Sequence, residues 1–144
     1  MRRFDVSEYI DEELQFADRS EALALFERKA DEFGAKHLIY GILDPGKNSG
    51  TLPFDAVTTY SLDWQHRYFM QRYFLTDPVL AKTRANRVPF DWAADRYEDR
   101  DTQRFFGESC EFGVGNQGVC IPLHGPEGEI CGFSFNVNMS DREW

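Results

Sequence analysis

Residues 60–79 read YSLDWQHRYFMQRYFLTDPV, and the first two thirds of this stretch predict an aromatic helix over residues 62–74. Tyr60, Trp64 and Tyr68 recur every fourth residue, so a helix that extended back to Tyr60 would carry all three on one face. On spacing alone, an aromatic stripe of this kind is most often part of a hydrophobic core.

The end of the same stretch predicts the start of another helix. Asp77 followed by Pro78 is the usual pairing of an N-cap with the first helical residue, although an aspartate in this place is often only a cap. A loop that carries Pro89 and Trp92 follows, and residues 101–112 are predicted to form a further helix that the next glycine ends.

Upstream of the aromatic stretch, two helices are expected. Residues 6–16 are acidic and weakly amphipathic. Ser20 can cap a second helix, which Gly34 ends. Its apolar stripe at three- and four-residue intervals is Leu23, Phe26, Ala30 and Phe33.

Four segments predict strands, namely 37–43, 54–59, 118–123 and 129–138. Turn-forming residues at 44–50 and 124–128 separate the members of each pair. Helices and strands do not alternate as βαβ units, so the fold class is α+β with an antiparallel sheet. Neither face of the last strand is plainly polar, which predicts helices on both faces of the sheet.

Size and charge narrow the class of protein. The chain has 144 residues, which suits one domain over residues 1–144, and a net charge of −9. It has no basic cluster of the kind that binds phosphates, so no direct binding to nucleic acid is expected. There is no apolar run long enough to span a membrane and no signal peptide, so we expect a cytoplasmic protein.

Metal and thiol chemistry find little support in the sequence. The three cysteines form no C-x-x-C pair and the three histidines are scattered, so neither a disulfide framework nor a metal site is expected. The aromatic content is high, with 13 Phe, 6 Tyr and 3 Trp, which fits either a well-filled core or an apolar ligand pocket.

One ordered set of residues resembles a known family. The pattern Tyr60-x3-Trp64-x3-Tyr68-x8-Asp77-Pro78-Val79 is similar to the signature of LuxR-type autoinducer-binding domains. Further matches follow in order: Pro89-Phe90-Asp91-Trp92, Phe105-Phe106, Gly113, Gly118, Pro122-Leu123-His124-Gly125, Gly128 and Ser134. The resemblance covers about residues 16–144, and its specificity lies in the order of the pieces.

This resemblance implies an α-β-α sandwich of the PAS or GAF kind, with a central antiparallel sheet of about five strands. The ligand would be an N-acyl homoserine lactone enclosed between the sheet and one helical layer. The resemblance implies a sensor without enzymatic activity or cofactor, acting as a homodimer or as a heterodimer with a related regulator. The helix-turn-helix domain of full-length members is absent from these 144 residues, so DNA binding would need that further domain.

The residue types suit the chemistry of such a ligand. The indole N–H of Trp64 can donate to the lactone carbonyl, and the carboxylate of Asp77 can accept from the amide N–H. A hydroxyl from Tyr60 or Ser134 can donate to the amide carbonyl. The remaining candidate ligand contacts that the resemblance implies are Tyr68, Val79, Trp92, Tyr97 and Cys120.

Two departures and three alternatives stay open. Cys120 stands where some family members carry a polar residue, and the interval between Gly113 and Gly118 is about one residue longer than in close relatives. The chain could instead be a short protein that pairs with a full-length regulator and inhibits it, or a related sensor for a different ligand. A thiol hydrolase using Cys110 or Cys120 is disfavoured, because neither cysteine lies in a recognisable pattern with a histidine.

Overall fold

The computed structural model describes residues 19–47 and 55–137, and the helix expected over residues 6–16 lies outside them. Five strands form one antiparallel sheet in the order β2-β1-β5-β4-β3. The strands are β1 (His37–Asp44), β2 (Asp55–Thr58), β3 (Phe90–Ala93), β4 (Gln117–His124) and β5 (Ile130–Val137). The helices are α2 (Arg19–Phe33), α3 (Leu62–Met70), α4 (Pro78–Ala85) and α5 (Arg100–Glu111), with short 3-10 turns η1 (Tyr73–Leu75) and η2 (Ala94–Arg96).

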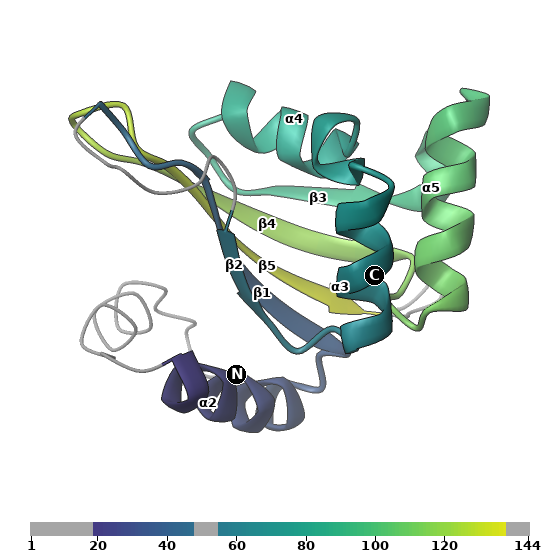
Figure 1. The fold of residues 1–144 in the computed structure, drawn as a ribbon, viewed down its shortest axis with the longest axis horizontal. Coiled ribbons are helices and arrows are strands. Elements are labelled where there is room, and N and C mark those ends of the chain that lie inside the picture. The colour runs from purple at the N-terminus through teal and green to yellow at the C-terminus, as the bar shows by residue number, and fades with distance from the viewer. Residues whose placement is uncertain (1–18, 48–54, 138–144) are drawn as a thin grey trace.

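The sheet is sandwiched between helices, as the sequence predicts. Helix α2 packs on β1 and β2 on one face, and α3, α4 and α5 lie on the opposite side (Figure 1). Alternation along β5 separates the two faces. Phe133 and Phe135 turn toward α2, whereas Gly132, Ser134 and Asn136 turn toward the three-helix side. The α+β sandwich is therefore confirmed.

Helix α2 ends where its sequence predicts, but the face it buries is rotated. Gly34 has φ +69, and the N–H of Ala35 donates to the carbonyl of Ala30 at 2.9 Å, as in a Schellman cap. The buried side chains are Ala22, Leu25, Phe26 and Ala30. Phe33 is half-exposed, and Ser20 lies inside the helix and not at its cap, so these two expectations were wrong.

Strand β3 was expected to be a loop, and that expectation was wrong. Residues Phe90–Ala93 pair with β4, in the register Phe90 to Cys120 and Trp92 to Gly118. Four residues are too few to show a two-residue period in the sequence, and pairing to the neighbouring strand is what makes them a strand. Pro89 precedes this edge strand, where its missing N–H costs no ladder hydrogen bond.

The aromatic helix is shorter than the predicted 62–74. It ends at Met70, and Arg72 takes a left-handed backbone with φ 54 before η1 begins. The break turns the ring of Tyr73 onto that of Trp64, with centroids 5.9 Å apart. A continuous helix would place Tyr73, nine residues after Trp64, on the opposite face of the helix, so the break allows the two rings to meet.

An ion-pair cluster ties α3, η1 and α5 into one wall. Glu108 of α5 binds both Nε and Nη2 of Arg67, at 3.1 and 2.9 Å, and accepts a hydrogen bond from the Tyr73 hydroxyl. These donors lower the pKa of Glu108 to about 2.

Of the helices that the structure describes, none is long and apolar enough to cross a membrane.

Candidate functional site

A cavity of about 280 Å³ lies between the sheet and the three-helix side. Its walls combine apolar and aromatic side chains with a few polar groups, which is the usual composition of a small-molecule site. The polar or ionisable side chains of its lining are Arg19, Thr58, Tyr60, Gln65, Tyr68, Asp77, Thr83, Ser109, Cys120, Ser134 and Asn136, together with the indoles of Trp64 and Trp92.

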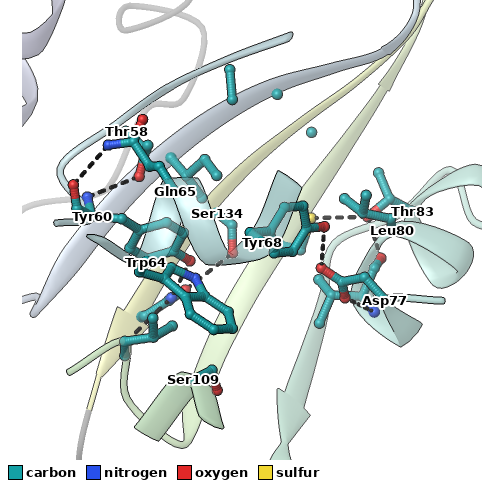
Figure 2. Close-up of a pocket in the computed structure, with 18 of the residues that line it drawn as sticks. Thr58, Tyr60, Trp64, Gln65, Tyr68, Asp77, Leu80, Thr83, Ser109 and Ser134 are labelled. Atoms are coloured by element: carbon teal, nitrogen blue, oxygen red, sulfur yellow. Dashed lines mark hydrogen bonds between the residues drawn. The ribbon is translucent and has the colours of Figure 1, made fainter. Parts of the chain in front are cut away.

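The aromatic stripe contributes to the cavity, although not as one helical face. Ser61 caps α3 by accepting from the N–H of Trp64, so Tyr60 lies just before the helix. Its side chain still lines the cavity, together with Trp64 and Tyr68 (Figure 2). The connection between β2 and α3 therefore carries Tyr60, and α3 carries the other two residues of the motif.

Asp77 has two roles, one for each oxygen. Oδ1 accepts from the N–H of Val79 at 2.9 Å and caps α4, whereas Oδ2 accepts from the hydroxyl of Tyr68 at 2.8 Å (Figure 2). Desolvation raises the pKa of Asp77 to about 6 in spite of these donors. A carboxylate oxygen accepts more than one hydrogen bond, so Asp77 keeps acceptor capacity toward the cavity.

Trp64 supplies a donor with no partner of its own among the described residues. The residue is 2% exposed, and its ring packs against those of Tyr68, Tyr73, Phe105 and Phe112. These contacts hold the indole in place, and no hydrogen bond from its N–H is found within residues 19–47 and 55–137. Because Trp64 lines the cavity, an indole N–H without a partner among the described residues is available to a ligand acceptor.

Trp92 is a tightly packed part of the cavity wall. Its ring stacks on that of Phe106, with centroids 5.6 Å apart, and its buried Nε1 has no hydrogen-bond partner among the residues that the structure describes. On the other side it lies directly over Gly118, where a Cβ would come within 2.5 Å of Nε1. The glycine that the family resemblance singles out is thus needed for a close approach.

Substituting Gly118 by Ala is expected to lower the free energy of unfolding by about 1–3 kcal/mol, because the added methyl group displaces Trp92. Gly107 is the matched control: it lies inside α5 with no atom within 4 Å of its would-be Cβ, so Gly107→Ala should stabilise the chain by about 0.5–1 kcal/mol. Urea unfolding of both variants measures the two effects. Equal stability of the two would contradict the proposed close approach.

Cys120 and Thr83 contribute polar side chains to the cavity wall, and these are mostly uncharged. The thiol lies 3.3 Å from the hydroxyl of Thr83, which also donates to the carbonyl of Val79 at 2.7 Å. Burial raises the pKa of Cys120 to about 11, so the thiolate is scarce near neutral pH and the cysteine is a poor nucleophile. This environment does not support the hydrolase hypothesis. Within the described ranges, no cluster of three His, Cys, Asp or Glu side chains could hold a metal ion.

Eight of the nine candidate residues from the sequence line the cavity, and Tyr97 does not. Tyr97 packs against Phe106, with ring centroids 5.3 Å apart, and Phe106 in turn lines the cavity. Sequence reasoning did not single out Thr58, Gln65, Thr83, Ser109 or Asn136. Two-residue alternation from Ser134 points to Asn136, and one helical turn from Val79 points to Thr83.

Sequence comparison relates the chain to autoinducer-binding domains and to proteins named as transcriptional regulators. The family model described as "Autoinducer binding domain" matches residues 18–144. The transcriptional activator protein RaiR of Rhizobium etli is 37% identical over 86 residues, which cover 60% of this chain and 36% of RaiR. The chain spans about a third of the length of the curated relatives it matches, which are transcriptional regulators and not enzymes.

Solved structures share the fold. CepR2, an N-acylhomoserine lactone dependent LuxR family transcription factor from Burkholderia cenocepacia, matches with a TM-score of 0.71 at 16% identity, over 95% of this chain and 80% of CepR2. SdiA in complex with octanoyl-rac-glycerol matches with a TM-score of 0.66 at 17% identity, over 99% of this chain and 61% of SdiA. Since the family model spans residues 18–144, the chain belongs to the autoinducer-binding domain family.

Proposed function

We propose that this chain binds an N-acyl homoserine lactone, as the sensory domain of a LuxR-type quorum-sensing transcription regulator. An autoinducer-binding domain takes a small-molecule ligand. The observation that carries the choice of ligand is the cavity in which Trp64, Asp77 and Tyr60 present two donors and an acceptor among apolar walls. CepR2, which shares the fold, is dependent on a ligand of this class.

The lactone carbonyl, the amide N–H and the amide carbonyl of the ligand each have a complementary group. The indole N–H of Trp64 suits the lactone carbonyl, and the carboxylate of Asp77 suits the amide N–H. The hydroxyl of Tyr60 suits the amide carbonyl. Ser134 is less suited to that role, because its hydroxyl donates to the carbonyl of Val119 at 3.0 Å.

The acyl chain would lie against the apolar part of the same walls. Side chains that offer such contacts are Ile39, Leu43, Ala56, Phe69, Val79 and Leu80. We propose that Tyr68, Trp92 and Cys120 complete the lining around the ligand.

For the whole regulator we propose dimerisation, with an identical or a related chain, and DNA binding through a further domain. The net charge of −9 makes the chain itself a poor partner for a polyanion. Because the whole regulator would act on DNA, we propose a cytoplasmic location.

The proposal is tested by calorimetry with a panel of N-acyl homoserine lactones of four to twelve acyl carbons, and with octanoyl-rac-glycerol as the matched control. The glycerol ester carries an acyl chain and hydroxyls but lacks the amide N–H that Asp77 would accept. We expect at least one lactone to bind more tightly than the ester. Equal or tighter binding of the ester would assign the cavity to a different ligand class.

Lactone binding is expected to weaken at acid pH. The pKa of Asp77 is about 6 in the ligand-free chain, and an added N–H donor favours the ionised form, so binding lowers that pKa. Affinity should therefore rise with pH up to about 6 and level off above about pH 7, with about a fivefold loss between pH 6 and pH 5. Titrations between pH 5 and 7 measure the slope. Asp77→Asn should show a flat profile, and a slope retained in that variant would assign the effect to another group.

A further inference from the structure

We infer that Asn136 is a positioning residue that sets the direction in which the Tyr60 hydroxyl points its proton. The inference rests on the proposed function, because it concerns how Tyr60 meets the ligand carbonyl. Asn136 is fully buried at 0% exposure, lines the cavity from β5, and contacts Tyr60 from the opposite end of the chain.

The orientation of the Asn136 amide is defined by its neighbours. Its Nδ2 lies 3.5 Å from the carbonyl of Val114, an atom that can only accept. Its Oδ1 lies 3.5 Å from the hydroxyl of Ser134, whose own proton is directed at the carbonyl of Val119, so Val114 is the neighbour that sets the orientation. The reverse orientation would place two acceptors together at Val114, so the amide presents an N–H, and not its oxygen, to Tyr60.

Tyr60 is therefore an acceptor in its contact with Asn136. The Nδ2 group donates to the Tyr60 oxygen, so the phenolic proton must point elsewhere. Within the described ranges no acceptor for that proton is found, and the side chain lines the cavity. His37 packs edge-on to the Tyr60 ring, with ring centroids 5.1 Å apart, and so supports the ring in this position.

As a consequence, the Tyr60 hydroxyl acts as a hydrogen-bond donor toward the cavity. A ligand carbonyl that approaches Tyr60 meets a proton that no protein group claims, so the contact requires no exchange of hydrogen bonds. A carboxylate at position 136 would reverse this arrangement, because it accepts only and would take the Tyr60 proton for itself. The phenolic oxygen would then face the ligand carbonyl as a second acceptor, which is repulsive.

A double-mutant cycle distinguishes this role from a merely structural one. We would measure affinity at pH 7.5 for wild type, Tyr60→Phe, Asn136→Asp and the double variant, using the lactone of the panel that binds wild type most tightly. In the wild-type background, Tyr60→Phe should weaken binding about tenfold. In the Asn136→Asp background the same substitution should cost nothing or improve binding. An unchanged tenfold penalty would overturn the inference.

Asn136→Leu serves as a second variant should the buried carboxylate prevent folding. It keeps the branching and the number of heavy atoms and removes the donor that directs the Tyr60 proton, so the penalty of Tyr60→Phe should fall at least threefold. Isotope-edited infrared spectra of the ligand-free chain with labelled tyrosine, taken as wild type minus Tyr60→Phe, test the orientation without any lactone. A phenol that donates to the protein there would overturn the inference, whereas failure of every lactone to bind would overturn only the proposed function.

Discussion

Replacing Trp64 by Phe, or Asp77 by Asn, is expected to weaken lactone binding by about 10- to 100-fold, the equivalent of one lost buried hydrogen bond. Trp64→Phe keeps an aromatic ring against Tyr73 and Phe105 and removes the indole donor together with one of the two fused rings. Asp77→Asn preserves an N-cap, because asparagine caps helices as well as aspartate does. In that variant, however, an NH2 group replaces one oxygen, so either Tyr68 or the ligand amide faces a donor where it needs an acceptor.

The matched control for both variants is Tyr97→Phe. Tyr97 belongs to the sequence-derived candidates but packs against Phe106 and does not line the cavity, so losing its hydroxyl should leave the affinity unchanged. Calorimetric titration of the three variants with one lactone provides the comparison. Wild-type affinity in both Trp64→Phe and Asp77→Asn would reduce those residues to a core stripe and a helix cap.

The ligand-free chain is expected to be poorly stable, and its lactone should raise the melting midpoint by at least several degrees. An ionised Asp77 with a pKa of about 6 costs on the order of 3 kcal/mol relative to the unfolded chain. An empty cavity of about 280 Å³ also forfeits packing contacts. A ligand at a hundredfold excess over its dissociation constant adds about 2.7 kcal/mol by mass action, which for this size of domain corresponds to several degrees.

Differential scanning fluorimetry across the lactone panel measures this shift. The Asp77 contribution has a sign that can be checked separately. Because the folded pKa lies above the unfolded one, stability from this group is complete below about pH 4 and is lost as pH rises through 6. Ligand-free wild type should therefore lose stability relative to Asp77→Asn between pH 5 and 7. A cooperative, ligand-insensitive melt would contradict the prediction.

Local signals explain the parts of the fold that the sequence predicts. Gly34 and Gly113 both end helices with positive φ, as glycines after apolar periodic segments commonly do. The hairpin of β4 and β5 follows from its turn residues. Strand β3 and the break at Arg72 were missed, because both depend on distant partners, the edge of β4 and the ring of Trp64.

The candidate site shows the same division. The residues that the resemblance points to come together, but their hydrogen-bond roles depend on neighbours that no motif names. Asn136 decides what Tyr60 can offer, and Tyr68 occupies one oxygen of Asp77. Asn136 and Tyr60 are 76 positions apart, and Tyr68 meets Asp77 across the connection from α3 to α4. Both pairings follow from strand register and helix packing and are not visible in spacing.

The two faces of the sheet differ in how their side chains are packed. On the α2 side, Phe26 meets Phe133 edge-on at 5.9 Å, and this cluster is complete in itself. On the other side, α3, α4 and α5 enclose the cavity. We therefore expect the α2 side of the sheet to be stable without ligand, whereas the stability of the α3 to α5 side depends on whether the cavity is occupied. In amide hydrogen exchange of the ligand-free chain, α3, α4 and α5 should open before global unfolding, while α2 and β1 stay protected. A bound ligand should suppress this partial opening, so that the chain unfolds more cooperatively when the cavity is occupied.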